Sequence, residues 1–335
     1  MPVRATDQQA AQRRVGAPVV VVGAGVAGLT TAACLAEAGF SVQVLTKDPP
    51  LSTTSATAGA IWGPYLGGPR KVTVEWGRRT LGILSTLAQS PAETGVRILT
   101  GMEAARRPTP APPWSRQLDS FTACPPQDLP PDFAVGWTFS APVIDMPRYL
   151  DYLMRRLARA GGTVKHTHVR ALGTVDPAPS VLVNCTGAEA AGFVPDAGVL
   201  ASRGQTVVVA NPGVRRFFVE ECGDDRDQLY VLPHGSTVVL GATLEPGRSD
   251  RRPNRQDSAR ILSRCAAVEP ALCGARIIAE RVGVRPQRDS VRLEVDRSLD
   301  YPVVHNYGHG GAGVSLSWGC ALHVRALAAA LCKSG

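Results

Sequence analysis

The sequence predicts an α/β protein in which a parallel sheet flanked by helices is joined to a second domain built on a largely antiparallel sheet. The first observation is a strand–turn–helix–strand unit near the beginning of the chain. The second is a series of short apolar strands over 205–210, 228–232 and 236–240, which is typical of an antiparallel sheet. With 335 residues, the chain is long enough for two domains with separate cores.

The first unit has the order of a nucleotide-binding βαβ motif. The four valines at 19–22 predict a buried parallel strand, residues 29–38 a helix that Gly39 ends, and 40–45 the next strand. Between strand and helix stands G-x-G-x-x-G, formed by Gly23, Gly25 and Gly28. In this context the pattern indicates a Rossmann-type dinucleotide site. The alternative is a tight strand-to-helix turn without a ligand.

A second glycine-rich segment lies near the other end of the chain. Four glycines fall between 308 and 313, and a helical pattern follows at once. Free N–H groups and the positive end of the helix dipole attract negative charge at such a helix start. Two such starts, far apart in the sequence, suggest one large, elongated cofactor held at both ends.

The residues between these segments indicate an interrupted nucleotide domain. We expect helices over 77–88, 146–160 and 255–268, strands over 163–169 and 180–185, and a proline-rich mixture of strands and long loops over 97–142. The predicted division is a disordered arm (1–17), a discontinuous cofactor-binding domain (18–66, 143–192 and 281–335) and a substrate domain (67–142 and 193–280).

Composition argues against several other classes of protein. The net charge is +8, but the arginine pairs at 106–107 and 251–252 are short and lack interleaved aromatic residues, so we expect no nucleic-acid partner. Residues 18–36 carry no charge, yet they divide into strand, turn and helix, so we expect no membrane span or signal peptide and a cytoplasmic location. The eight cysteines form no C-x-x-C pair. His305 and His309 are four apart but glycines surround them, so we expect no metal site.

Together these motifs resemble the D-amino-acid oxidase family of flavoenzymes. The matching pieces occur in family order and cover most of the chain from Val19 onward. Besides G-x-G-x-x-G they are T-T-S at 53–55, A-G-A-I-W-G-P-Y at 58–65, V-N-C-T-G at 183–187, R-G-Q at 203–205, Y-V-L-P at 230–233, G-V-R-P at 283–286 with V-R-L-E at 291–294, and H-N-Y-G-H-G-G at 305–311.

The resemblance implies non-covalently bound FAD. The hydroxyl groups of Thr53 and Thr54 would support the phosphates, and the backbone of Val169 would contact the adenosine side. The helix start at 310–315 would stabilise the negative charge of reduced flavin. Asp48 is the candidate for the ribose, although it stands one position later than usual; the alternative is a solvent-exposed loop acid. The implied cofactor-binding residues are Gly23, Gly25, Val26, Ala27, Gly28, Asp48, Thr53, Thr54, Ser55, Gly59, Ala60, Val169, Thr186, Gly187, Arg285, Gly310, Gly311, Gly313, Val314 and Ser315.

The resemblance also implies how a D-amino acid would be held. Arg285 would grip the carboxylate with two hydrogen bonds, which a point charge could not do as selectively. Tyr230 would donate to the same carboxylate, and the carbonyl of Gly311 would accept from the amine. The alternatives are a structural salt bridge for Arg285 and a core role for Tyr230. These contacts aim Cα–H at flavin N5 for hydride transfer, so no catalytic acid or base is expected. The products are a 2-oxo acid, ammonia and hydrogen peroxide, with O2 as the acceptor.

Side-chain preference follows from the matching pocket positions Ile61, Gly63, Leu232 and Leu244. Because these are apolar or minimal, we expect neutral D-amino acids to fit and acidic ones to be disfavoured. Three acidic residues at 224, 225 and 227 would tolerate a basic side chain. The family's lid tyrosine is replaced by Arg226, so we expect no aromatic lid. The alternatives are a glycine, secondary-amine or D-aspartate oxidase of the same fold, or a non-catalytic dinucleotide-binding protein; a homodimer is left open.

Overall fold

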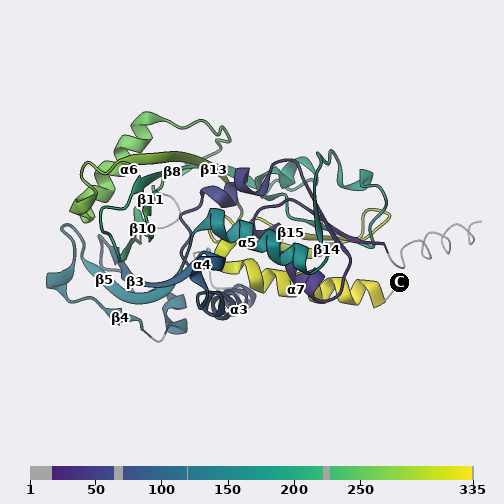
Figure 1. Cartoon of the computed structure of the whole chain (residues 1–335), viewed down its shortest axis with the longest axis horizontal. Coiled ribbons are helices and arrows are strands. Elements are labelled where there is room, and N and C mark those ends of the chain that lie inside the picture. The colour runs from purple at the N-terminus through teal and green to yellow at the C-terminus, as the bar shows by residue number, and fades with distance from the viewer. Residues whose placement is uncertain (1–16, 64–70, 119, 222–226, 334–335) are drawn as a thin grey trace, which may run out of the picture.

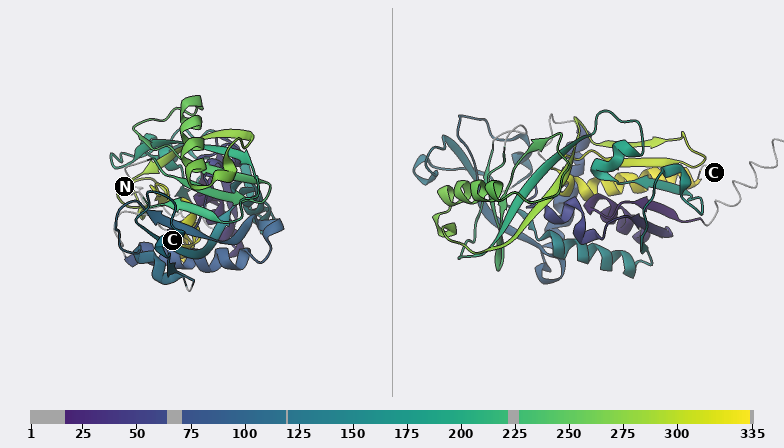
Figure 2. Two further views of the ribbon diagram at one scale, coloured as in Figure 1. Left: turned by 90° about the vertical axis from the view of Figure 1, so that its left-hand side faces the viewer. Right: turned by 90° about the horizontal axis from the view of Figure 1, so that it is seen from above.

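Two sheets lie side by side along the length of the molecule. The computed structural model describes residues 17–63, 71–118, 120–221 and 227–333. In Figure 1 the sheet at the right lies with α7 (Gly313–Lys333), and the sheet at the left lies beneath α6 (Arg255–Val268). Figure 2 shows the same elongated outline from above. The predicted α/β class is confirmed.

The first sheet is parallel except at one edge. Its strand order is β14-β15-β7-β1-β2-β6, and only the pair of β14 with β15 is antiparallel. The strands are β14 (Arg292–Asp296), β15 (Val303–Tyr307), β7 (Val181–Asn184), β1 (Val19–Val22), β2 (Val42–Thr46) and β6 (Thr163–His166). All four valines of β1 are buried, as expected for a strand covered on both faces.

The position of β1 in the sheet determines where a ligand can bind. β1 lies between β7 and β2, and the next segment of the chain after β1 enters α2 (Val26–Glu37). The chain therefore reverses its direction of winding beside β1, and ligands of open α/β sheets bind at the carboxyl ends of strands at such a point.

Helices cover this sheet closely. α2 packs against α7 and α5 (Met146–Arg159), while α3 (Lys71–Leu87) packs against α7; the short α4 is Pro91–Thr94. The indole N–H of Trp318 on α7 donates to the hydroxyl of Tyr149 on α5 over 2.8 Å. A Cβ on Gly319 would lie 2.3 Å from the backbone of Trp76. Only glycine lets α7 approach α3 this closely.

The second sheet is antiparallel apart from the β3–β9 pair. Its order is β12-β8-β11-β10-β9-β3-β5-β4, and β13 pairs with β8 along its other side. The strands are β3 (Val96–Ala105), β4 (Thr122–Ala123), β5 (Val135–Ile144), β8 (Leu200–Ala210), β9 (Phe217–Glu220), β10 (Tyr230–His234), β11 (Thr237–Gly241), β12 (Glu245–Pro246) and β13 (Ile277–Gln287).

Several predicted bounds differ from the structure. The helix predicted over 77–88 begins six residues earlier, at Lys71, and the strand predicted over 163–169 ends at His166. The predicted domain boundary at 281 falls inside β13, which belongs to the second sheet, and α3 packs on the helix of the first. The domain division stays a prediction. The predicted arm lies outside the described residues, apart from Ala17.

α7 is long and apolar enough to cross a membrane by length and composition alone. Its apolar side chains are instead enclosed by the protein, among them Leu316, Trp318 and Val324. The same helix packs along α2 and α3. Its hydrophobicity is therefore explained by its place in the core.

Candidate active site

Two adjoining cavities lie where the two sheets meet. The first has a volume of about 230 Å³ and runs along the carboxyl ends of β1, β2 and β7. The second, of about 450 Å³, is enclosed by residues 58–63, β9, β10 and the end of β13. They share the wall residues Ala58, Tyr230, Arg285, Gly310, Gly311 and Val314. One elongated ligand can therefore reach from the first cavity to the mouth of the second.

The glycine motif allows β1, β7 and α2 to approach one another. Gly23 has φ +106°, and a Cβ there would lie 2.4 Å from the carbonyl oxygen of Cys185. A Cβ on Gly28 would lie 1.9 Å from the carbonyl oxygen of Gly23. Gly23, Gly25, Val26 and Ala27 line the first cavity, whereas Gly28 does not. Gly28 allows the helix to pack against its own turn, and its predicted contact with the cofactor stays a prediction.

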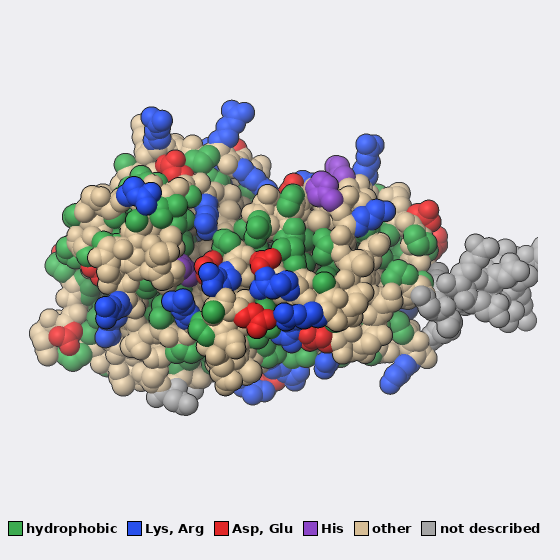
Figure 3. Space-filling model, in the orientation of Figure 1, with side chains coloured by type: hydrophobic (Ala, Val, Ile, Leu, Met, Phe, Trp, Pro, Cys, Tyr) green, Lys and Arg blue, Asp and Glu red, His purple; other side chains and the backbone are tan. Residues whose placement is uncertain are grey.

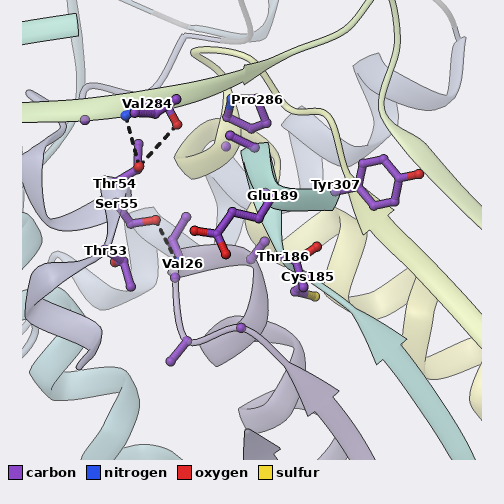
Figure 4. Close-up of a pocket in the computed structure, with 18 of the residues that line it drawn as sticks. Val26, Thr53, Thr54, Ser55, Cys185, Thr186, Glu189, Val284, Pro286 and Tyr307 are labelled. Carbon is purple, nitrogen blue, oxygen red and sulfur yellow. Dashed lines mark hydrogen bonds between the residues drawn. The ribbon is translucent and has the colours of Figure 1, made fainter. Parts of the chain in front are cut away.

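The segment 53–55 crosses in front of the start of α2 (Figure 4). The N–H of Val26 donates to Ser55 Oγ over 2.9 Å, so the Ser55 hydroxyl keeps its own proton. Thr53 donates its proton to the carbonyl of Pro50, and Thr54 donates to the carbonyl of Val284. Both threonines line the cavity. Thr54 also links this segment to β13. Their contact with the phosphates stays a prediction.

The far end of the first cavity is closed by charged residues from several elements. Asp48, which follows β2, lines the cavity, and its carboxylate lies 3.6 Å from the guanidinium of Arg251. Lys47 donates to Glu189 over 2.5 Å, and Glu189 also lines the cavity (Figure 4). Val169 lies here, together with Thr186 and Gly187. Asp48 is therefore a cavity residue rather than a free loop acid.

The second helix start faces the junction of the cavities. Gly308 and Gly310 have φ of +81° and +53°, which favours glycine. The N–H of Gly310 donates to the carbonyl of Pro286 over 2.9 Å, so the loop is fixed to the end of β13. Gly310, Gly311, Gly313 and Val314 all line the first cavity. The first turn of α7 has no acidic side chain, which leaves its positive end for a ligand.

Arg285 extends from β13 to the wall shared by both cavities. Its Nη1 donates to the carbonyl of Thr243 over 3.1 Å. Within the described residues it forms no ion pair with a carboxylate, so the alternative of a structural salt bridge finds no partner there. Burial lowers the pKa of Arg285, while the neighbouring Tyr230 and Asp227 oppose that shift. A half-buried guanidinium without an ion pair to a described carboxylate is a strong site for an anionic group.

Tyr230 lies beside Arg285 between two glycines. A Cβ on Gly59 would lie 2.5 Å from its ring, and a Cβ on Gly241 would lie 2.0 Å from it. Burial raises the pKa of Tyr230 to about 12, although the charge of Arg285 lowers it. The hydroxyl therefore keeps its proton at neutral pH and can donate a hydrogen bond.

The remaining wall of the second cavity is a segment tied down at both ends. Ile144 N–H donates to the carbonyl of Ala60, which has φ +55°, and Gly63 N–H donates to Ser315 Oγ over 3.0 Å. Ser315 lines neither cavity and supports Gly63; its cofactor contact stays a prediction. The predicted residues that do line the second cavity are Gly59, Ala60, Ile61, Gly63, Tyr230, Leu232, Leu244, Arg285, Gly310, Gly311 and Val314.

Some lining residues carried no signal in the sequence. Gln287, Glu221 and Asp289 line the second cavity, and His168 and His309 line the first. His309 stood within the H-N-Y-G-H-G-G segment, which is the one signal that could have found it. The lid position Arg226, Gly223 and the acidic residues at 224 and 225 lie outside the described residues. No cluster of metal-ligating side chains is found in the part of the chain that the structure describes.

The comparisons with known proteins agree with this geometry. The family model described as FAD dependent oxidoreductase matches residues 18–327. A protein of Rubrobacter xylanophilus named D-amino-acid oxidase is 45% identical over 319 residues, which cover 95% of this chain and 97% of that protein. This chain belongs to the D-amino-acid oxidase family. A human member named D-aspartate oxidase is 33% identical over 93% of this chain and 94% of its own length.

Solved structures show the same fold. The structure of a glycine oxidase from Geobacillus kaustophilus superposes with a TM-score of 0.78 at 20% identity, and covers 94% of this chain and 95% of that one. At this identity the likeness concerns the fold alone. FAD is the cofactor of this family, and a member of it needs an elongated site at the end of a Rossmann-type sheet.

The residues present fit FAD. The starts of α2 and α7 both open on the first cavity, and α2 has no side-chain cap of its own. Within the described residues, the buried atoms His309 Nε2 and Gln287 Oε1 have no hydrogen-bond partner. His309 lines the first cavity and Gln287 the second. Buried polar atoms without partners are rare in folded proteins, so both are suited to a polar ligand.

Proposed function

We propose that this protein oxidises D-amino acids with bound FAD. One observation carries the proposal: the guanidinium of Arg285 lies at the junction of the two cavities without an ion pair to a carboxylate of the described residues, and the Tyr230 hydroxyl is beside it. An amino acid in the second cavity would thereby have its carboxylate at the boundary with the cofactor site. The 45% identical relative with the same activity in its name supports this assignment.

The chain's own residues bind and orient the substrate. Arg285 retains donors besides the one given to Thr243, and these suit a bidentate grip on the carboxylate. Tyr230 donates to the same group, and the carbonyl of Gly311 accepts from the amine. The chemistry that FAD supplies when bound is removal of a hydride from Cα and reduction of O2 to hydrogen peroxide. Water then converts the imino acid to a 2-oxo acid and ammonia.

The walls of the second cavity favour neutral and basic side chains. Ile61, Leu232 and Leu244 are apolar, and Glu221 and Asp289 add negative charge. Arg288, the other guanidinium in the wall, is paired with Asp196 at 3.2 Å. An acidic side chain would therefore meet apolar or like-charged groups, which is unfavourable.

A peroxide assay over matched amino acids tests the function. We expect release of hydrogen peroxide with D-alanine and other neutral D-amino acids, activity with D-lysine or D-arginine, and little with D-aspartate. The L-enantiomers should be inert, because the three fixed substituents leave their Cα–H pointing away from the flavin. Efficient turnover of glycine, a secondary amine or D-aspartate alone would favour the alternative oxidases of this fold. Failure of D-alanine to bleach the bound flavin without oxygen would leave only a dinucleotide-binding protein.

Two further expectations belong to this proposal. The cytoplasmic location and a homodimer both stay predictions. Cell fractionation checks the first, and light scattering of the purified holoprotein checks the second.

A further inference from the structure

A fully buried arginine lies behind the substrate arginine. Arg203 on β8 has no exposed surface, and its guanidinium forms ion pairs with Glu245, with Asp257 at 3.3 Å and with Asp250 at 3.4 Å. It also donates to Gln205 Oε1 over 2.9 Å. The same carboxylates also pair with Arg248 and Arg260. One of them, Glu245, connects this cluster to the active site.

That connection runs through Thr243. Its hydroxyl accepts from the N–H of Gln205 over 2.9 Å and donates to Glu245 Oε1 over 3.3 Å. Its own N–H donates to the carbonyl of Gln205 over 3.1 Å. The peptide of Thr243, held on both sides, then presents its carbonyl to Arg285 Nη1 at 3.1 Å. This is the hydrogen bond by which the protein holds the Arg285 guanidinium in the described structure.

The residues next to Arg203 on β8 also form the surface beneath Arg285. Gly204 stands between Arg203 and Gln205, and a Cβ there would lie 2.2 Å from Arg285 Nη1. β8 and β13 are in register so that Val284 lies opposite Arg203. The acceptor of the guanidinium and the backbone against which it lies are therefore both fixed by the residues around Arg203.

We propose that Thr243 and Glu245 are positioning residues that set the orientation of Arg285 for the substrate carboxylate. The proposal rests on the proposed function for the identity of that carboxylate. A long side chain without an ion-pair partner has several rotamers, and one fixed acceptor selects the rotamer that aims the remaining donors into the second cavity. Neither Glu245 nor Thr243 is among the described residues that line the two cavities, so their route to the substrate runs through Arg285.

Matched variants separate positioning from simple support of the fold. Thr243→Val keeps the shape and removes the hydroxyl, whereas Thr243→Ser keeps the hydroxyl. Glu245→Gln replaces the charged acceptor of the Thr243 hydroxyl by a neutral amide oxygen, which weakens that hydrogen bond. Asp257→Asn removes another buried carboxylate from Arg203 that forms no bond to Thr243.

We expect Thr243→Val and Glu245→Gln to raise KM for D-alanine by roughly tenfold, the factor of one lost hydrogen bond, with kcat within about twofold of the wild type. Thr243→Ser, which keeps the hydroxyl, should have the KM of the wild type. Asp257→Asn should lower Tm and leave KM unchanged, because its loss does not reach Arg285.

Binding of propanoate, a carboxylate without an amine, gives a second readout through the absorption spectrum of the bound flavin. Its Kd should rise with KM in Thr243→Val and Glu245→Gln. Wild-type KM and Kd in both variants, or an equal rise in Asp257→Asn, would overturn the positioning role. If the wild type binds propanoate but oxidises no D-amino acid, the proposed function fails while the Kd values still decide the positioning role. Should Thr243→Val not fold, Glu245→Gln decides alone.

Discussion

Arg285 is half-buried and forms no ion pair with a carboxylate of the described residues. We expect Arg285→Lys to raise KM for D-alanine and to lower kcat/KM by one to two decades, because a bidentate grip becomes a single contact worth about 1.5–3 kcal/mol less. Steady-state peroxide release measures it. Arg281→Lys is the matched control, since Arg281 lies on the same strand but lines neither cavity. Unchanged kinetics for Arg285→Lys would remove it from the site.

His309 makes stability depend on pH. Burial lowers its pKa to about 4, from 6.5 in an unfolded chain. Between those values the unfolded chain binds a proton and the folded protein does not, so the free energy of unfolding falls as pH drops from 6.5 to 4. The loss is about 3 kcal/mol at most. Thermal unfolding of the cofactor-free protein at several pH values measures it. His309→Gln should flatten the curve in this range; an identical pH dependence would contradict the assignment.

The contact of α7 with α3 depends on Gly319 and not on Gly82. A Cβ on Gly319 would lie 2.3 Å from the backbone of Trp76, whereas a Cβ on Gly82 of α3 would meet nothing within 4 Å. We expect Gly319→Ala to lower Tm and to weaken FAD binding, because the start of α7 must move. Gly82→Ala should raise stability by up to about 1 kcal/mol through helix propensity. Calorimetry of both variants compares them, and equal Tm values would refute the packing argument.

The ends of β2 and β7 are joined by an ion pair across the end of β1. Lys47 and Glu189 are both about half exposed, so the pair itself contributes little to stability. Lys47→Ala would leave the Glu189 carboxylate without this partner in the wall of the first cavity, where an anionic cofactor would be held. We expect FAD affinity to fall about fivefold at low salt, and Lys47→Ala/Glu189→Ala to restore it. Fluorescence titration of the cofactor-free protein measures both; no recovery in the double variant would contradict this reading.

The sequence predicted the helices and strands that have a clear hydrophobic pattern. It did not predict strands that depend on pairing with a distant part of the chain. β1 and α6 lie where predicted because their patterns are local. β13 was not predicted, since Pro286 and Gly283 weaken a strand pattern, and it is stabilised by pairing along β8. The bond of the Thr54 hydroxyl to Val284, 230 residues away, was not predicted because it exists only in the folded chain. Motif residues were thus brought together largely as predicted, but their hydrogen bonds required the structure.

At the scale of the whole molecule, the cavity for the cofactor is built from both sheets. The first cavity takes residues from the parallel sheet and from β8, β10 and β13 of the second sheet. We expect one FAD per chain, held without a covalent bond, and released into the supernatant when the protein is precipitated with acid. Flavin retained in the pellet would contradict this.

The surface charge is mixed at this scale. On the face shown in Figure 3, Lys and Arg side chains are interspersed with Asp and Glu side chains instead of forming one basic stripe.

Bound FAD should raise the stability of the folded protein. FAD at about 100 times its Kd should stabilise the fold by about 2.7 kcal/mol. The resulting rise in Tm should be similar at low and moderate salt if backbone groups, rather than surface charges, hold the cofactor.

The order of assembly follows from the central place of β15 and α7. β15 pairs with β7, and α7 packs on α2, so the last portion of the chain completes the site that the first fifty residues begin. During synthesis on the ribosome, the glycine turn after β1 emerges long before the helix start of α7 that faces the same cavity. A nascent chain therefore cannot offer both helix starts to the flavin until α7 has been translated.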